Sequence, residues 1–476
     1  MTAPRPTHSP EPTSLATRFV ESAYGLLAKT SGYNAWRHFQ ALQRNQWLSR
    51  DELDAMRWKK FQNLLDHAEN SIPFYQKRWR DADVQPSQFT SIDDIKELPV
   101  VTKQDLIAGQ QNDEFNLSRR NDFEMTHTSG TTGPCMYLPF TKHDLQVKYA
   151  AYLREFYATD WRLGMPSAAM HYSGHPEFAG KYTGKPDRDN FVLTRKLAFR
   201  WAHRRILLTP YFHTESGNDT LPAQWYQALK KHRPFLLETM DFSLVTLFNY
   251  IQNNDLPPLS IPRIFVLSTL SPKFKARLES AFSAEIFDRY GPHEIEGVAY
   301  ACHKHVGMHI AIDCVHVEFL DEANHSVDQG DSGHLVLTDF HSRVMPLIRY
   351  KIGDIGSCIP EPCSCGMSFP LINEIHGRTR DRFELSDQSL TPPIHLISIV
   401  QDEPAVRLFQ LDQQPDGHII ANVIPDDKLW SPSVQERLTT NLAAALPGGS
   451  KDFSLATTNK VPLEHNGKFT YAKRSS

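Results

Sequence analysis

Apolar residues recur at helical spacing over the first part of the chain, from about residue 15 to residue 80. Five of them share one face of a predicted helix: Trp58, Phe61, Leu64, Leu65 and Ala68. Pro73 interrupts this pattern, because proline lacks a backbone donor and clashes with the preceding turn. The sequence therefore predicts a helical N-terminal region with a break near residue 73.

A different pattern begins at residue 263, where a continuous apolar run predicts a buried strand over 263–270. Ser271 is a favoured N-cap for a helix over 271–282, and a second strand follows over 284–291. This β-α-β order predicts a parallel sheet with helices packed on it. Two further apolar runs predict additional strands: 309–320 and 333–340.

The pattern changes again after residue 377. Two apolar runs flank the hairpin signal Gln-Gln-Pro-Asp-Gly at 413–417, a helix is predicted over 431–446, and a strand follows. These elements predict a small α/β module of a size that folds separately. The expected fold class is α/β, with a large multi-sheet N-terminal domain and a small mobile C-terminal lid.

The predicted domain boundaries follow from these changes. The large domain is expected over 17–377 and the lid over 378–476, while residues 1–16 are polar, Pro-rich and expected to be a disordered tail. A length of 476 residues is too great for one core and agrees with two domains.

Composition excludes several classes of function. The net charge of −4 gives no basic excess for nucleic-acid binding. No apolar run is long enough to span a bilayer, and the start of the chain has no signal-peptide core. We therefore expect a cytoplasmic protein without a membrane or nucleic-acid partner.

A Gly/Thr-rich string is the first candidate for chemistry. It consists of Thr128, Ser129, Gly130, Thr131, Thr132 and Gly133. Glycines let backbone N–H groups turn toward a polyphosphate, and the hydroxyls add donors. It lacks the Gly-Lys-Ser/Thr ending of a Walker loop, and an ordinary turn is the alternative interpretation.

Four shorter strings follow it along the chain. They are Tyr290-Gly291-Pro292-His293-Glu294, Arg349-Tyr350-Lys351-Ile352-Gly353-Asp354, Gly377-Arg378-Thr379-Arg380-Asp381 and Asn466-Gly467-Lys468. The Glu294 carboxylate suits Mg²⁺, and the Asp354 carboxylate suits the two hydroxyls of a ribose. Asn-Gly is a hairpin turn that can present Lys468 as a mobile charge. Each string alone could equally be a surface loop.

Cysteines are the last signal from the residues themselves. Cys135 stands alone, whereas the other cysteines are crowded into one stretch: Cys302, Cys314, Cys358, Cys363 and Cys365. Three thiolates and one imidazole form a closed, structural zinc site, and the predicted set is Cys302, His309, Cys363 and Cys365. His303, His305 and Cys358 are rival ligands, and reduced buried thiols are the alternative to any metal.

Taken together in their order, the strings resemble the adenylate-forming superfamily of acyl-CoA synthetases, adenylation domains and luciferases. Within it the chain is similar to the phenylacetate–CoA ligase branch, and most of all to members associated with capsular polysaccharide biosynthesis. Four further strings carry that likeness: Ile72-Pro73-Phe74-Tyr75, Leu98-Pro99 with Thr102-Lys103, Met345-Pro346-Leu347-Ile348-Arg349-Tyr350, and Cys363-Ser364-Cys365-Gly366. The likeness covers residues from about 55 to 470.

The resemblance implies a role for each string. Residues 128–133 would grip the β- and γ-phosphates of ATP, with His293 beside them. Tyr290 and Gly291 would line the adenine and acyl pockets, and Ser268 and Thr269 would lie close to the base. Glu294 would hold Mg²⁺, and Asp354 and Arg378 would bind the ribose. Lys468 would bridge the substrate carboxylate and the α-phosphate. The likeness also raises the expectation of zinc at the cysteine cluster.

Three positions depart from the family pattern: Pro134, His293 and Arg380. The usual residues there are a lysine after the phosphate loop, a serine or threonine, and an acidic hinge residue. The first two departures put the rate of adenylation in doubt. The third puts the rotation of the lid in doubt.

The expected function is activation of a carboxylic acid by ATP, an AMP-forming ligase reaction, followed by transfer of the acyl group to CoA. One alternative acceptor is an amine, a hydroxyl or a carrier-protein thiol. Another class remains open, a degenerate homologue that binds a nucleotide without turnover. The acid pocket is expected between about 170 and 300, and the family suggests a flat or aromatic acid and a homodimer.

Overall fold

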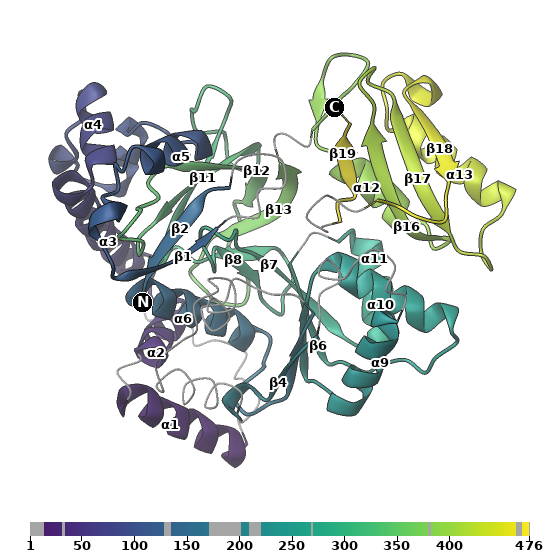
Figure 1. The fold of residues 1–476 in the computed structure, drawn as a ribbon, viewed down its shortest axis with the longest axis horizontal. Coiled ribbons are helices and arrows are strands. Elements are labelled where there is room, and N and C mark those ends of the chain that lie inside the picture. The colour runs from purple at the N-terminus through teal and green to yellow at the C-terminus, as the bar shows by residue number, and fades with distance from the viewer. Residues whose placement is uncertain are drawn as a thin grey trace.

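The computed structural model describes residues 14–30, 34–127, 135–170, 201–208, 220–267, 270–378, 382–462 and 469–475 (Figure 1). Its helices are α1 (Leu15–Thr30), α2 (Ala35–Asn45), α3 (Arg50–Ser71), α4 (Pro73–Asp81), α5 (Lys103–Gln111), α6 (Lys142–Ala158), α9 (Leu221–His232), α10 (Asp241–Asn253), α11 (Pro272–Phe282), α12 (Ile394–Gln401) and α13 (Pro432–Ala444). None of these described helices is long and apolar enough to cross a membrane.

The strands fall into four sheets. Those of the large part are β1 (Phe123–His127), β2 (Tyr137–Thr141), β3 (Ser167–Ala169), β4 (Arg205–Leu207), β5 (Leu236–Thr239), β6 (Arg263–Val266), β7 (Glu285–Tyr290), β8 (Ala299–Ala301), β9 (Met308–Ile310), β10 (Val315–Leu320), β11 (Ser332–Asp339), β12 (Tyr350–Ile359) and β13 (Leu371–Arg378). The remaining strands are β14 (Phe383–Glu384), β15 (Leu390–Thr391), β16 (Val406–Gln413), β17 (Ile419–Pro425), β18 (Phe453–Thr457) and β19 (Ala472–Arg474).

An eleven-stranded sheet organises the large part, in the order β10-β11-β12-β13-β9-β8-β7-β6-β5-β3-β4. Strands β3 to β7 pair in parallel, and the pairings from β7 to β10 are antiparallel. Strand β7 therefore joins a parallel half to an antiparallel half. The predicted α/β class and the predicted parallel unit are both confirmed.

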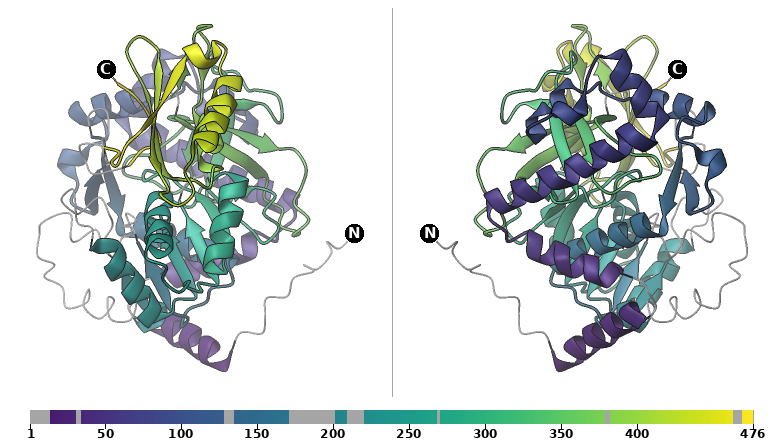
Figure 2. Two further views of the ribbon diagram at one scale, coloured as in Figure 1. Left: turned by 90° about the vertical axis from the view of Figure 1, so that its right-hand side faces the viewer. Right: turned by 90° about the vertical axis from the view of Figure 1, so that its left-hand side faces the viewer.

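The parallel half is covered by helices on both faces. Ile264 and Ile286 share a core with α9, α10 and α11, whereas Phe265 and Phe287 face the core that contains α6. This alternation is the two-residue period of a strand buried on both sides. The left view of Figure 2 shows the teal helices α9 to α11 lying over one face.

The β6-α11-β7 unit matches the sequence closely. The Ser271 hydroxyl accepts a hydrogen bond from the backbone N–H of Phe274, so it caps α11 as predicted. Strand β6 ends at Val266, and residues 268 and 269 of the predicted strand lie outside the described residues.

The prediction of one strand over 309–320 was wrong. Strand β9 ends at Ile310, and β10 begins at Val315 and pairs with a different neighbour. Between them the Asp313 carboxylate turns inward to a buried ion pair with Arg154, 2.9 Å away. A buried charge requires such a partner, and the inward turn ends the strand.

The N-terminal region is helical, as predicted. Helix α3 begins at a capping box of Ser49 and Glu52 and buries one apolar face, while Trp58 is partly buried. Pro73 is the first residue of α4, where its missing N–H costs nothing. Helix α1 begins at Leu15, and residues 1–13 of the predicted tail lie outside the described residues.

The C-terminal part has its own four-stranded sheet, in the order β18-β17-β16-β19. The predicted hairpin is present as β16 and β17, and the predicted helix is present as α13 with Ser431 as its N-cap. Apolar side chains of this sheet and of α12 and α13 form a separate core. The boundary expected at residue 377 stays a prediction.

Candidate active site and candidate metal centre

The predicted phosphate loop connects β1 and β2. These strands form a two-stranded antiparallel ribbon in which His127 lies opposite Tyr137. Residues 128–133 lie outside the described residues, as does Pro134. The structure therefore describes the two strands that carry the loop, and the role of the loop stays a prediction.

The turn from Tyr290 to Glu294 directly follows β7, at the junction of the two halves of the sheet. A Cβ atom at Gly291 would lie 3.0 Å from the backbone nitrogen of Gly297, a contact tighter than side chains normally make. The turn closes with a hydrogen bond from the Ile295 N–H to the Pro292 carbonyl, at 2.9 Å. Glycine at position 291 thus lets the chain fold back tightly.

Glu294 is held by two neighbouring side chains. The Tyr350 hydroxyl donates to the carboxylate at 3.4 Å, and the Lys148 ammonium donates to the backbone carbonyl at 2.9 Å. Lys148 comes from α6, and it also lies 4.3 Å from the ring centroid of Phe140 on β2. This lysine therefore ties the turn to the ribbon that carries the phosphate loop.

Sequence analysis missed Lys148, because its spacing from every motif is unremarkable. Burial lowers the pKa of Lys148, while Glu296, Asp339, Asp144 and Glu294 raise it. A motif search has no means of detecting a lysine whose partner is a backbone carbonyl. Only the three-dimensional fold shows the contact.

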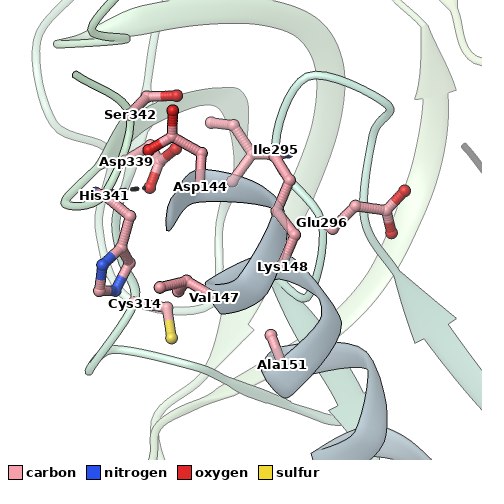
Figure 3. Close-up of a pocket in the computed structure, with 10 residues that line it drawn as sticks. All are labelled: Asp144, Val147, Lys148, Ala151, Ile295, Glu296, Cys314, Asp339, His341 and Ser342. Carbon is pink, nitrogen blue, oxygen red and sulfur yellow. Dashed lines mark hydrogen bonds between the residues drawn. The ribbon is translucent and has the colours of Figure 1, made fainter. Parts of the chain in front are cut away.

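A small cavity lined by both charged and apolar side chains lies beside this lysine (Figure 3). Its space for a water-sized probe is about 20 Å³, which accommodates about one water molecule. Burial raises the pKa of Asp144 and lowers that of His341, so burial opposes the charged form of both lining residues. The cavity is too small for a substrate.

His293 also reaches toward the ribbon. Its Nε2 lies 3.3 Å from the Thr126 hydroxyl oxygen, just before the phosphate loop. Burial lowers the pKa of His293, so the imidazole is neutral at neutral pH. The residue that departs from the family pattern therefore supplies a hydrogen-bonding group and no positive charge.

The predicted ribose residues lie on neighbouring strands. Asp354 of β12 pairs in register with Arg378 of β13, whose side chain lies outside the described set. The Tyr290 hydroxyl donates to the Asp354 carboxylate at 2.6 Å. The structure thus brings Tyr290 and Asp354 together, in a contact that sequence analysis did not predict.

Besides residues 128–133, three further predicted site residues lie outside the described residues: Ser268, Thr269 and Lys468. The hinge residues Arg380 and Asp381 do so as well. Their roles stay predictions.

The cysteine cluster is a compact set of potential ligands. One ligand atom each from Cys302, His309, Cys363 and Cys365 lies within 4.8 Å of all the others. The sulfurs of Cys302 and Cys363 are 3.7 Å apart, and the Cys365 sulfur is 3.3 Å from His309 Nε2. Tetrahedral zinc with Zn–S bonds of about 2.3 Å separates two sulfurs by about 3.7 Å, so the first distance fits such a centre.

Hydrogen bonds from surrounding groups orient these potential ligands. His309 is buried, and its Nδ1 lies 3.2 Å from the Phe369 carbonyl, which leaves Nε2 facing the sulfurs. Backbone N–H groups of Lys304 and Met367 donate to the sulfurs of Cys302 and Cys365. The pKa of Cys302 is lowered, first because the Cys365 thiol donates to it, which favours a thiolate.

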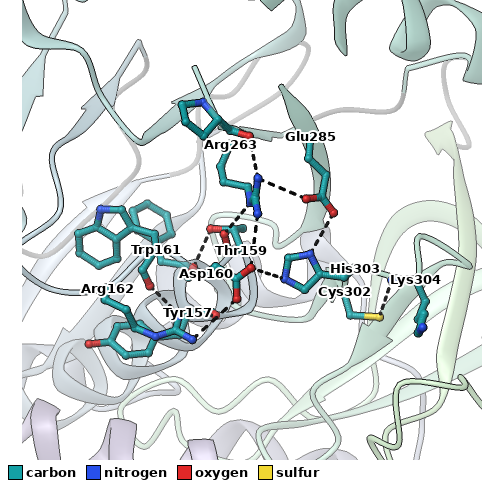
Figure 4. Close-up of polar contacts among 12 residues, drawn as sticks. Tyr157, Thr159, Asp160, Trp161, Arg162, Arg263, Glu285, Cys302, His303 and Lys304 are labelled. Carbon is teal, nitrogen blue, oxygen red and sulfur yellow. Dashed lines mark hydrogen bonds and ion pairs between the residues drawn. The ribbon is translucent and has the colours of Figure 1, made fainter. Parts of the chain in front are cut away.

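Two rival ligands are engaged elsewhere. His303 is 3.0 Å from both the Glu285 and the Asp160 carboxylates (Figure 4), and His305 is 2.9 Å from Glu285. Hydrogen bonds to Asp160 and Glu285 raise the pKa of His303 to about 9, so its ring is a cation at neutral pH. A protonated imidazole cannot bind metal, so His303 is excluded as a ligand in this arrangement.

Comparison with known proteins follows this geometry. The chain matches no protein-family model. A phenylacetate–coenzyme A ligase of Thermus thermophilus is 24% identical over 354 residues, which cover 72% of this chain and 74% of that protein. Protein CapK of Staphylococcus aureus is 21% identical over 433 residues, 89% of each protein.

A solved structure extends the likeness to the whole fold. The 2-hydroxyisobutyryl-CoA ligase in its postadenylation state has a TM-score of 0.74 and 18% identity, covering 90% of this chain and 91% of that one. The same ligase in its thioesterification state has a TM-score of 0.62. The fold is that of the adenylate-forming ligases. The chain is similar in sequence to the phenylacetate–CoA ligases and to CapK, which confirms the resemblance predicted from its motifs.

Proposed function

We propose that the protein is an ATP-dependent, AMP-forming ligase that converts a carboxylic acid to an acyl-adenylate and transfers the acyl group to CoA. The observation that carries this proposal is the contact between Tyr290 and Asp354 at the carboxyl end of β7, in the turn that leads to Glu294, in the fold of adenylate-forming ligases. In open α/β sheets, ligands bind where the order of strands switches direction.

The first half-reaction follows from these positions. A carboxylate oxygen of the acid attacks the α-phosphorus of ATP, the bond to the β-phosphate oxygen breaks, and pyrophosphate leaves. Negative charge grows on the phosphate oxygens, and Lys468 is placed by its motif to offset it. Asp354 would accept hydrogen bonds from the ribose hydroxyls, with Arg378 beside it, and residues 128–133 would hold the departing phosphates.

Magnesium is part of the proposal. Glu294 offers the hard oxygen ligand that Mg²⁺ prefers, and Tyr350 and Lys148 keep this residue in place. When held by Glu294, the ion would supply positive charge that offsets the negative charge of the phosphates.

Zinc is proposed as a structural ion at the cysteine cluster. Three sulfurs and one imidazole nitrogen leave no open position for catalysis. The ion would tie the loop between β8 and β9 to the connection between β12 and β13, and its binding would stabilise the fold.

The proposal also specifies the acyl acceptor and the class of carboxylic acid. CoA is the proposed acceptor because the homologous ligases are named for it. The acid is proposed to be flat or aromatic, and we further propose that the protein is a cytoplasmic homodimer. Three segments of the region expected to form the acid pocket lie outside the described residues, 171–200, 209–219 and 268–269.

Pyrophosphate exchange against a panel of carboxylic acids tests the proposal. Exchange that depends on one class of acid, followed by thioester formation with CoA, is the expected result. Exchange without thioester would replace CoA with an amine, hydroxyl or carrier-protein acceptor. Absence of exchange with every acid would identify a nucleotide-binding homologue without turnover.

A further inference from the structure

The turn that carries Tyr290 and Glu294 is closed at its base by an ion pair. Arg289 directly precedes Tyr290 at the end of β7, and Glu296 lies two residues after Glu294. The Arg289 Nη2 atom donates to the Glu296 carboxylate at 3.0 Å. Two residues that are seven positions apart are thus joined, and the turn of the candidate active site lies between them.

Arg289 lies on the face of the sheet that packs against α6. Successive residues of a strand face opposite sides, so Arg289 shares its side with Phe287, which belongs to the core that contains α6. Its guanidinium lies 2.9 Å from the Glu155 carboxyl group of α6 and 3.2 Å from the Glu238 carboxylate of β5. The guanidinium carbon lies 5.5 Å from the ring centroid of Phe265, on the strand between β7 and β5. Arg289 therefore connects the base of the turn to a helix and to another strand.

The side chains around Arg289 are withdrawn from water. The Arg289 side chain is 1% exposed, and Glu155 and Glu238 are fully buried. Burial raises the pKa of Glu155 to about 8, against the opposing effect of Arg289, so this carboxyl group is mainly protonated at neutral pH. Glu238 also pairs with Arg205. Two arginines thus face two carboxylates, Glu238 and Glu296, and one neutral carboxyl group, so the charges of this group balance.

Helix α6 also contacts the turn at two further points. Gly297 follows the turn with a φ of +73°, and a Cβ atom there would lie 2.7 Å from the Cβ of Ala151 in α6. Lys148 donates to the Glu294 carbonyl at 2.9 Å. Lys148, Ala151 and Glu155 lie at helical spacing on one face of α6, and Figure 3 shows the first two. One helix therefore supports the turn at its base, at Glu294 and at its end.

We propose that Arg289 and Glu296 are positioning residues, whose ion pair holds the turn between them in the geometry that adenylation requires. The inference rests on the proposed function, because the turn carries the residues that would act on the ribose and on Mg²⁺. Tyr290 reaches the Asp354 carboxylate at 2.6 Å, so a shift at the base of the turn displaces this contact together with Glu294. A misplacement of about 1 Å can cost about a hundredfold in rate. The ion pair restricts the turn before the substrate binds.

A second buried arginine offers a matched control. Arg154 of α6 pairs with Asp313 at 2.9 Å, and the two side chains are 1% and 0% exposed. Asp313 lies in the connection between β9 and β10, outside the turn. Weakening either arginine's ion pairs destabilises buried carboxylates and lowers the stability of the fold. An effect on the turn beyond this loss of stability therefore distinguishes Arg289 from Arg154.

The first test measures the Mg²⁺ dependence of pyrophosphate exchange in the full-length protein. Glu296→Ala should fold, because the Glu296 side chain is 17% exposed and Arg289 keeps two other acidic partners. The Mg²⁺ concentration for half-maximal exchange should rise by roughly three- to tenfold, the scale of losing one charged hydrogen bond. Glu296→Gln, which keeps an acceptor for Arg289, should recover most of the wild-type value.

The two arginines are compared by the same conservative change. Arg289→Lys and Arg154→Lys should both lower the melting temperature. Arg289→Lys should also raise the Mg²⁺ requirement as Glu296→Ala does, because a lysine cannot serve three carboxyl groups in the fixed geometry of a guanidinium. Arg154→Lys should leave the Mg²⁺ requirement unchanged. An equal rise in both lysine variants would overturn the inference.

Hydrogen exchange without ATP or Mg²⁺ gives a readout that does not depend on activity. A peptide covering 289–297 should exchange faster in Glu296→Ala and in Arg289→Lys, and at the wild-type rate in Arg154→Lys. An unchanged Mg²⁺ requirement or unchanged hydrogen exchange in Glu296→Ala would show the inference to be wrong. If the wild type activates no acid, the proposed function fails, and hydrogen exchange still decides whether the ion pair holds the turn.

Discussion

The candidate active site and the candidate zinc centre share one hairpin but are built differently. The β12–β13 pair carries Asp354 opposite Arg378 at one end, and Cys363 and Cys365 lie in the connection at its other end. All four predicted zinc ligands lie among the described residues, with ligand atoms within 4.8 Å. By contrast, the phosphate loop and Lys468 of the active site lie outside them.

The difference teaches how each site obtains its geometry. The cysteine cluster is fixed by strand register and by backbone N–H groups aimed at sulfur, so one arrangement of the chain suffices. The proposed active site combines the strand ends at Tyr290 and Asp354 with residues 128–133 and Lys468, and a reaction in two steps requires such parts to change partners. Substitutions in the cysteine cluster should therefore lower the stability of the fold. Substitutions in the active site should lower the rate of adenylation.

The largest expected effect comes from removing the lysine. Lys468→Ala should reduce acid-dependent pyrophosphate exchange by roughly 10²-fold or more, the scale of losing one preorganised charge. Melting temperature should stay unchanged. Lys473→Ala on the nearby strand β19, where Lys473 faces Asp412 at 3.4 Å, is the control and should keep its activity. Near-normal exchange in Lys468→Ala would remove this lysine from the reaction.

Glu294→Gln should reduce the same exchange by roughly tenfold or more, because a neutral amide is a weaker ligand for Mg²⁺ than a carboxylate. A higher concentration of Mg²⁺ should recover part of the loss, and a titration of rate against Mg²⁺ measures this. An unchanged Mg²⁺ dependence would contradict the assigned role.

Substitution of a zinc ligand should lower the stability of the protein and leave its exchange activity intact. Cys365→Ser should abolish stoichiometric zinc and lower the melting temperature by roughly 5–10 °C, while the folded protein keeps its exchange activity. Elemental analysis and thermal unfolding check this. Cys358→Ser, outside the four-residue set, should keep the metal. Wild-type protein purified without zinc would show that the cluster is a set of reduced thiols.

Asp354→Asn tests whether the two sites on the β12–β13 hairpin act independently, because it changes the candidate ribose site and leaves the cysteine cluster intact. Loss of charged hydrogen bonds to the ribose should raise the KM for ATP by about tenfold and leave zinc content unchanged. Steady-state kinetics with metal analysis of the same sample tests both halves of the statement. Joint loss of zinc and ATP affinity would mean that the hairpin acts as one unit.

The smallest effect is expected at Tyr290. Tyr290→Phe removes the hydroxyl that donates to Asp354, a single neutral donor, so the KM for ATP should rise only about threefold. Measuring Tyr290→Phe in the Asp354→Asn background separates the two contributions. An additive result would show that the tyrosine does not act through the aspartate.

The sequence predicted elements where local signals agreed with the fold. The Ser271 cap, the strands around α11 and the C-terminal hairpin were all correct, because capping and alternation act over a few residues. The strand over 309–320 failed because Asp313 finds its partner Arg154 far along the chain. Such a pairing has no local signature.

The residues of the candidate sites also separate into those with a local sequence signal and those without one. Contiguous strings predicted Glu294 and Asp354, and the crowding of cysteines together with the family resemblance predicted the four candidate zinc ligands, which lie close together in the structure. Lys148 was missed, because its partner is the backbone carbonyl of Glu294, 146 residues away in the sequence.

Strand β7 pairs in parallel with β6 and antiparallel with β8, and this has a consequence for how the family can diversify. On one side of β7 lie the strands expected to border the acid, and on the other lie those that carry Asp354 and the cysteines. The segments around β3 to β6 could be replaced by those of another ligase. This would change the parallel side of the sheet and leave the strand pairings from β8 to β13 intact. Chimeras joined within β7 would then inherit acid preference from one parent and nucleotide binding from the other.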